Sequence, residues 1–282
     1  MTAKGARSAL RVGRRGSVLL ALTTLVGLAA FGWPLLVHVR AGADTAHAAD
    51  APWIFVALVP LLLAIVVAEI ADGAFDAKAI AMLGILAACT AALRVPSPGI
   101  DGFEPMWFLV IVSGRALGRG FGFVLGALSL FTSALLTGGI GPWLPFQMLA
   151  AAWMGFGAGC LPAARGRVEL ALVAAYAGVA SLGYGLVTNF WFWPFVGSAT
   201  RLSYSPTASI LANLHRFVLF DAATSLGFDI PRALTNMVLV VVLGTPILAA
   251  LRRAARKAAF EAPVTLLATP GEPLPASLGG SH

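Results

Sequence analysis

Long apolar runs separated by short polar breaks dominate the chain. A helix needs about 20 apolar residues to cross the hydrocarbon core of a bilayer, and eight runs nearly free of charge approach that length. The pattern predicts eight transmembrane helices, over residues 17–37, 53–70, 79–93, 103–114, 121–137, 143–161, 168–188 and 230–251. The third and fourth runs are short, so these helices must tilt, borrow flanking residues or be shielded by neighbours, because an unsatisfied backbone group in lipid costs several kcal/mol.

The composition excludes a soluble globular protein. Of the 282 residues, 59% are hydrophobic and 11% are charged, whereas about 25% of the residues of a soluble domain are charged. The expected fold class is all-α, a polytopic transmembrane helix bundle. The net charge is +7. In a membrane protein the positions of the basic residues indicate the orientation of the chain, so no nucleic-acid partner is expected from this charge.

The basic residues predict the orientation in the membrane. If the amino terminus is inside, fourteen of the nineteen basic residues fall in inner segments, and the five outer ones are Arg40, Arg94, Arg201, Arg216 and Arg232. The positive-inside rule then places both termini in the cytoplasm and the chain in the cell membrane. Residues 17–37 could instead be a cleaved secretory signal, which would leave the other seven helices, but this run is long for a signal and a retained anchor is favoured.

Two stretches lie outside the predicted helices. Residues 258–282 are rich in proline and glycine and poor in large apolar residues, which predicts a disordered cytoplasmic tail. Residues 198–229 form a long outer segment, in which 209–225 are expected to form a short interfacial helix or a lid.

Several kinds of chemistry are absent from the sequence. No glycine loop ends in Lys and Ser or Thr, so the chain is not expected to hydrolyse nucleotide. The acids within predicted helices, Glu69, Glu104 and Glu169, each lie next to a helix end, which argues against coupling to protons or sodium ions. The four histidines, with Cys89 and Cys160, lack metal-ligand spacing, so neither metal nor cofactor is expected.

One alternative is a membrane enzyme. Asp72 and Asp76 share a helix face and, with Lys78 beside them, could serve an enzyme acting on a lipid at the inner face. A solvated turn is the favoured interpretation, because no second acidic cluster completes such a site. A membrane scaffold without a ligand is a third possibility.

Small residues recur at helical spacing along the third predicted helix. Ala77, Ala81, Gly84, Ala88 and Ala91 form one stripe, overlapped by Ala87–Ala91 and Ala88–Ala92 pairs. In lipid, helices associate by close backbone approach over small residues. The stripe therefore predicts a docking face, either for the chain's own helices or for a partner protein. Two further stripes predict internal packing: Gly118, Gly122 and Gly126, and Ala151, Gly155 and Gly159.

Aromatic and polar residues gather at three predicted outer helix ends. This composition is typical of a pocket for a largely apolar ligand oriented by a few hydrogen bonds; the alternative is an ordinary aromatic belt at the headgroups. The candidate binding residues are Glu104, Trp107, Trp143, Gln147, Asn189, Trp191 and Trp193.

Three strings carry a resemblance to a known family. They are the alanine-rich 79–88, Gly-Pro-Trp-Leu-Pro-Phe-Gln-Met at 141–148 and Asn-Phe-Trp-Phe-Trp-Pro at 189–194. Over 79–251 the chain resembles the substrate-binding S component of energy-coupling factor (ECF) transporters. The resemblance implies a six-helix core at 79–257, preceded by a basic terminus at 1–16 and two additional helices within 17–78.

The resemblance also implies a function. An S component captures a vitamin or related micronutrient from outside and docks onto a transmembrane T component driven by two ABC ATPases, without covalent chemistry of its own. The alanine face of its docking helix corresponds here to Ala81, Gly84, Ala88, Ala91 and Ala92, with glycine as a departure from pure alanine.

We assign the binding roles as hypotheses. The four tryptophans are expected to wall the cavity, Gln147 and Asn189 to orient the ligand, and Glu104 to provide a charge partner. Cobalamin is the first candidate ligand, because a wide aromatic mouth and a long outer segment suit a bulky molecule, and thiamin follows. The two additional helices could brace the bundle, contact a substrate-delivering protein or limit its rotation.

Overall fold

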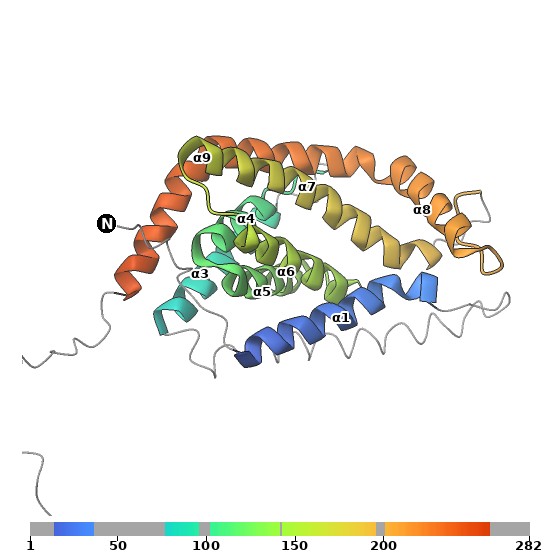
Figure 1. Cartoon of the computed structure of the whole chain (residues 1–282), viewed down its shortest axis with the longest axis horizontal. Helices are drawn as coiled ribbons and strands as arrows, with labels where there is room; N and C mark the ends of the chain where they lie inside the picture. The colour runs from blue at the N-terminus through green and yellow to red at the C-terminus, as the bar shows by residue number, and fades with distance from the viewer. Residues whose placement is uncertain (1–13, 37–76, 96–101, 142, 196–200, 260–282) are drawn as a thin grey trace, which may run out of the picture.

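The computed structural model describes residues 14–36, 77–95, 102–141, 143–195 and 201–259. All regular secondary structure in these ranges is helical, which confirms the all-α class (Figure 1). The helices are α1 (Arg14–Leu36), α3 (Ala77–Arg94), α4 (Met106–Leu117), α5 (Arg119–Thr137), α6 (Leu144–Cys160), α7 (Gly166–Phe192), the 3-10 turn η2 (Trp193–Phe195), α8 (Ile210–Thr224) and α9 (Leu226–Ala259). The predicted helix at 53–70, both Asp72 and Asp76, and the tail beyond Ala259 lie outside the described residues.

Four of the described helices are long and apolar enough to cross a membrane. They are Ala77–Arg94, Arg119–Thr137, Gly166–Phe192 and Leu226–Arg256. Two shorter apolar helical stretches, Gly16–Gly32 and Met106–Leu117, accompany them. The chain is therefore a membrane-embedded helical protein.

The two longest helices extend beyond their predicted bounds. α7 has 27 residues and α9 has 34, or about 40 and 51 Å at 1.5 Å per residue, against a hydrocarbon core about 30 Å thick. α9 begins at Leu226 rather than at residue 230, because Asp229 and Arg232 find partners inside the protein and do not end the helix. The predicted range includes Arg232 but begins after Asp229, because the apolar run was taken to begin after that charged residue.

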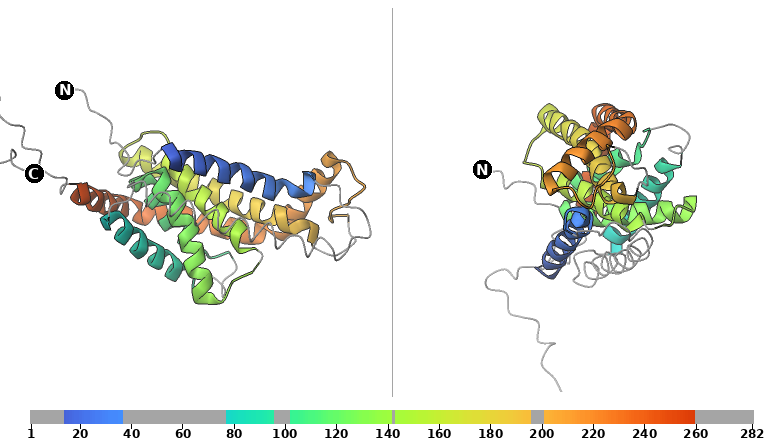
Figure 2. Two further views of the ribbon diagram at one scale, coloured as in Figure 1. Left: turned by 90° about the horizontal axis from the view of Figure 1, so that it is seen from below. Right: turned by 90° about the vertical axis from the view of Figure 1, so that its right-hand side faces the viewer.

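The long helices α7 and α9 pack side by side, α4 and α6 pack beside them, and α5 packs against α4 and α6. α8 lies where α7 ends and α9 begins, so that one end of the molecule carries α8 and the opposite end the carboxyl end of α9 (Figure 1, and Figure 2 from two further sides). We call these the α8 end and the opposite end. The predicted helix within 209–225 is confirmed as α8, which begins after Ser209, whose side chain accepts a hydrogen bond from the amide of Ala212 at 3.2 Å.

Two small-residue stripes join α5 to α6. A methyl group on Gly122 would collide with the backbone of Gly155, and one on Gly126 with the backbone of Ala151. At the far end of the same contact, a methyl group on Gly159 would meet the backbone of Arg119. The predicted internal packing of these stripes is confirmed, since only residues without larger side chains let the two backbones approach this closely.

Sharp backbone turns need glycine at two places between these helices. Gly118, between α4 and α5, has φ 109°, and Gly138 ends α5 with φ 68°. Both lie in the left-handed region that L side chains rarely adopt. These turns let α4, α5 and α6 run back and forth as neighbours.

The first helix packs on the outside of α6 and α7. Trp153 donates its indole N–H to Thr24 Oγ1 at 3.3 Å, and the Phe31 ring meets the Phe146 ring edge-on at 4.9 Å. The buried residues of this helix share one face: Gly16, Leu20, Thr23, Gly27, Ala30 and Phe31. Of the roles considered for the additional helices, bracing the bundle fits this contact.

Candidate functional site

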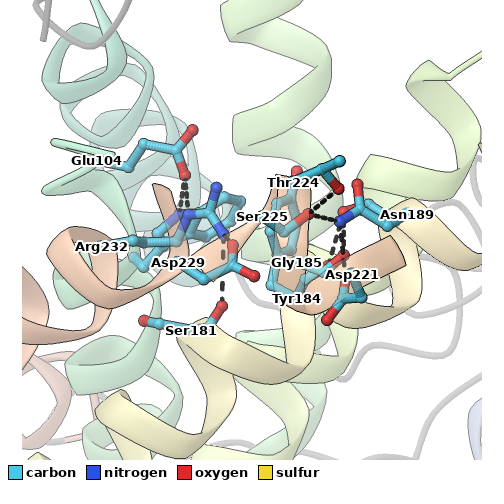
Figure 3. Close-up of polar contacts among 12 residues, drawn as sticks. Glu104, Ser181, Tyr184, Gly185, Asn189, Asp221, Thr224, Ser225, Asp229 and Arg232 are labelled. Carbon is cyan, nitrogen blue, oxygen red and sulfur yellow. Dashed lines mark hydrogen bonds and ion pairs between the residues drawn. The ribbon is translucent and has the colours of Figure 1, made fainter. Parts of the chain in front are cut away.

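A buried charged group joins α4, α7 and α9 in the half of the molecule nearer α8. Arg232 donates from Nε to Glu104 Oε2 and from Nη1 to Asp229 Oδ1, each at 2.5 Å. A further contact from Nη1 reaches the main-chain oxygen of Ser181 at 3.5 Å. Figure 3 shows the guanidinium between the two carboxylates. We call this group, with Trp107, Tyr184 and Asn236, the Arg232 cluster.

Aromatic rings line the cluster. Trp107 donates from Nε1 to Glu104 Oε2 at 2.8 Å, and its ring centroid lies 4.3 Å from that of Tyr184. The Arg232 guanidinium carbon lies 5.3 Å from the Tyr184 ring centroid, a cation–π distance. Trp107 is only 1% exposed. It therefore contributes a wall that is already packed against Tyr184.

Asn236 fixes α9 to the start of α4. Its side-chain oxygen accepts from the amide of Phe108 at 2.6 Å, and its nitrogen donates to the main-chain oxygens of Glu104 at 3.0 Å and Arg232 at 2.8 Å. Asn236 is fully buried. It satisfies backbone groups near the helix start that would otherwise be costly in lipid.

A second polar group lies where α7, α8 and α9 meet. Asn189 donates from Nδ2 to Asp221 Oδ1 at 2.9 Å and also to Ser225 Oγ. Figure 3 shows both contacts. Asp221 and Ser225 are each 8% exposed. We call Asn189, Asp221 and Ser225 the Asp221 junction.

The predicted Trp193 supports the segment that leads to α8. It is fully buried, donates from Nε1 to the main-chain oxygen of Leu202 at 2.7 Å, and packs against the rings of Tyr204 and Phe217. Burial raises the pKa of the Tyr204 phenol. Trp193 thus holds this segment onto α8.

The remaining predicted residues lie around the start of α6. Trp191 stacks on Phe146 with ring centroids 4.6 Å apart, and the buried side-chain oxygen of Gln147 has no hydrogen-bond partner among the described residues. Trp143 is 44% exposed and donates from Nε1 to the main-chain oxygen of Gly139 at 3.2 Å. Of the predicted binding residues, Glu104 and Trp107 therefore contact each other. Asn189, Trp191 and Trp193 each belong to a different group of contacts.

Sequence reasoning missed the residues that organise the Arg232 cluster and the Asp221 junction: Ser181, Tyr184, Asp221, Ser225, Asp229, Arg232 and Asn236. One signal was available, because Asp229, Arg232 and Asn236 follow one another at spacings of three and four, which places them on one helix face. A polar stripe at this spacing at the start of an apolar helix predicts a face turned into the bundle.

The small residues of α3 divide between two faces. Ala81, Gly84, Ala88 and Ala92 are exposed, and a methyl group on Gly84 would meet no atom within 4 Å. Ala91, the fifth predicted docking residue, is fully buried. It belongs to the inner face, with Ala79, Leu83, Leu86, Ala87 and Thr90.

A third charged group, the Glu169 cluster, lies toward the opposite end. Glu169 Oε1 accepts from Arg115 Nε at 2.7 Å and from Arg252 Nη2 at 2.5 Å. Arg115 also donates to the main-chain oxygen of Leu161 at 2.8 Å. The cluster therefore ties α4, α7 and α9 together beside the end of α6.

The lipid-enzyme alternative gains no support from the described residues. Its two aspartates lie outside them, and Lys78 is an exposed residue at the start of α3. In the described part of the chain, no three His, Cys, Asp or Glu side chains are placed to hold a metal ion.

Comparisons with protein-family models, with curated proteins and with solved structures give no match to this chain. Its function therefore has to be inferred from its own residues.

Proposed function

We propose that this protein is the substrate-binding S component of an ECF-type importer. In this role it binds a small organic micronutrient at the α8 end, which the positive-inside rule predicts to face the outside of the cell. It then associates through α3 with a transmembrane T component powered by two ABC ATPases. The observation that carries the proposal is the exposed small-residue face of α3.

The α3 face differs from the other small-residue stripes of the molecule. Gly122 and Gly155 are in backbone contact between α5 and α6, whereas Gly84 has open space in front of it. Exposed small residues leave the α3 backbone accessible to another helix, and close backbone approach is how helices associate in lipid. Contact with lipid chains does not require small side chains, since larger apolar ones serve equally well there. Such a face therefore suits contact with a separate membrane protein better than contact with lipid.

The ligand is proposed to bind near the Arg232 cluster and the Asp221 junction. Aromatic rings and a few oriented polar groups occur there together, as in sites for small organic molecules. The buried side-chain oxygen of Gln147, at the start of α6, has no hydrogen-bond partner in the described ranges, which supports a ligand contact at that helix end. Cobalamin is the first ligand to test and thiamin the second.

The docking proposal is tested with two matched double variants. Ala88→Leu/Ala92→Leu fills the exposed face of α3, and Ala171→Leu/Ala175→Leu makes the same change at two exposed alanines of α7. Each tagged chain is purified from its native membranes and the copurified proteins are identified by mass spectrometry. We expect wild type and the α7 variant to recover a polytopic membrane protein with two ATPases, and the α3 variant to lose them.

Two outcomes would contradict the proposal. Equal recovery of the ATPases by the α3 variant would remove the docking role of α3. Failure of wild type to recover any ATPase would contradict the assignment as an ECF component.

A further inference from the structure

Four exposed arginines surround the Glu169 cluster at the opposite end. Two lie at the start of α7 and two in the last turns of α9. Glu169 on α7 accepts from Arg252 Nη2 on α9 at 2.5 Å, so these two helix ends are in direct contact. Figures 1 and 2 show them at the same end of the molecule. We call the four residues the arginine rim: Arg165, Arg167, Arg253 and Arg256.

The arginine rim lies within about one helical turn of the contact between Glu169 and Arg252. The Glu169 amide donates to the main-chain oxygen of Arg165 at 3.4 Å, which places Arg165 one turn before Glu169. Arg253 follows Arg252 directly, and Arg256 comes one turn after Arg252. Because α7 begins here and α9 ends here, the rim lies toward the opposite end of the molecule from Glu169.

The rim arginines have no anionic partner in the described part of the chain. Glu169 is the one carboxylate described near them, and it already accepts from Arg115 and Arg252. None of the four rim side chains forms an ion pair or a hydrogen bond with another described residue. Each guanidinium has five N–H donors, so the rim offers many donors to the surroundings of the protein.

The arginines of the α8 end are arranged differently. Arg232 pairs with two carboxylates, and Arg94 and Arg216 each donate to a neutral oxygen of the protein at 3.3 Å. Arg201 is exposed and has no described partner. One such arginine at the α8 end compares with the four of the rim, so positive charge without an internal partner is concentrated at the opposite end.

The length of α9 indicates the depth of the rim in the membrane. From Arg232 to Arg252 this helix measures about 30 Å at 1.5 Å per residue, which equals the thickness of the hydrocarbon core of a bilayer. The exposed side chains between these two arginines include Leu234, Val238 and Val242, which suit contact with lipid chains. The arginines that follow Arg252 therefore lie at the level of the lipid headgroups.

An anionic phosphate group suits such a set of arginines. Guanidinium groups bind phosphate oxygens through two parallel hydrogen bonds, and basic residues that directly follow a transmembrane helix attract anionic lipids. The headgroup of phosphatidylcholine carries an ammonium group that offsets its phosphate, whereas phosphatidylglycerol keeps a full negative charge. Four guanidiniums without internal partners therefore favour the anionic headgroup.

We propose that the arginine rim binds the headgroup phosphate of an anionic phospholipid from the surrounding bilayer. Arginines of both helices contribute, so the bound lipid adds to the contact that Glu169 and Arg252 make between the start of α7 and the end of α9. The inference depends on the membrane character of the chain and not on the proposed importer role.

The first test measures thermal unfolding of the wild-type chain in dodecyl maltoside micelles. The probes, at equal concentrations, are phosphatidylglycerol and phosphatidylcholine with the same acyl chains, and inorganic phosphate. A ligand that binds only the folded protein raises its unfolding temperature. We expect the unfolding temperature with phosphatidylglycerol to exceed that with phosphatidylcholine by at least about 2 °C, and we expect no rise with inorganic phosphate.

The second test compares two double variants that remove the same charge. Arg165→Gln/Arg253→Gln changes one rim residue on each helix, and Arg201→Gln/Arg216→Gln makes the same changes at the α8 end. In lipid-free micelles the rim variant should unfold like wild type, because its side chains have no described partner. Its affinity for phosphatidylglycerol, measured by native mass spectrometry during a lipid titration, should fall at least about fivefold. The α8-end variant should stay within twofold of wild type.

Several results would overturn the inference. Equal stabilisation by the two lipids would show that the headgroup charge is not recognised, and equal stabilisation by inorganic phosphate would make the rim a site for a free anion. Unchanged phosphatidylglycerol affinity of the rim variant would remove the role of the rim. An equal loss in the α8-end variant would show that the lipid responds to net charge and not to these arginines.

Discussion

Single polar residues in the interior of this bundle each make specific contacts between helices. Glu169 accepts from Arg115 and Arg252, so that one carboxylate joins α4, α7 and α9. The Glu169 and Arg115 side chains are 6% and 9% exposed. Removing one member of such a group leaves buried charge without a partner, which costs more than the intact pair contributes.

Glu169→Gln should therefore destabilise the protein by about 3 kcal/mol, the lower end of the range for a broken buried pair, because Arg252 is partly exposed to solvent. The change is measured as the shift in thermal unfolding in detergent. Arg253→Gln, at an exposed neighbour of Arg252, should leave the unfolding temperature unchanged. Equal unfolding temperatures for wild type and Glu169→Gln would show that the cluster contributes nothing to stability.

At the scale of helices, the same kind of residue serves different purposes according to the face on which it lies. The glycines of α5 and α6 bring two backbones into contact, and the exposed glycine of α3 has space in front of it. The spacing along the chain is similar in these helices. Whether such a glycine is packed or exposed depends only on where the neighbouring helix lies.

Two glycine variants test this difference. Gly155→Ala should destabilise by about 1–3 kcal/mol, because its methyl group meets the backbone of Gly122 and the helices have to separate. Gly84→Ala should be neutral or stabilise by about 0.5–1 kcal/mol, because alanine is the better helix former and meets no atom. Thermal unfolding of both variants under the same conditions measures the contrast, and equal effects would contradict the packing described for α5 and α6.

The whole molecule has two ends of different chemistry. The α8 end carries the carboxylates Glu104, Asp221 and Asp229, and the opposite end carries the basic residues of α9, Arg252, Arg253 and Arg256. The positive-inside rule predicts that this basic end faces the cytoplasm. If that prediction holds, the proposed ligand site faces the outside of the cell.

Reporter fusions test this orientation. A fluorescent protein that folds only in the cytoplasm should fluoresce when fused to either terminus, and a phosphatase active only outside should be inactive at both. Phosphatase activity at the carboxyl terminus would mean that α9 has the opposite orientation and that the proposed ligand site faces the inside of the cell.

Properties that depend on spacing along one segment were accessible from the sequence. Each predicted helix that falls within the described residues is present, and the α5 and α6 stripes pack as expected. Helix length and periodicity are local properties, and a membrane allows few structures other than helices with internally satisfied backbones.

Properties that depend on pairing between distant segments were not accessible. Glu104 and Arg232 are 128 residues apart, and nothing along the chain indicates that Arg232 takes Glu104 as its partner instead of leaving it to a ligand. The burial of Ala91 and exposure of Ala88 are similar cases, because lipid and protein interior are both apolar and small side chains suit either one. Which face of a membrane helix is covered follows from the packing of its neighbours, and that is settled only when the whole bundle has formed.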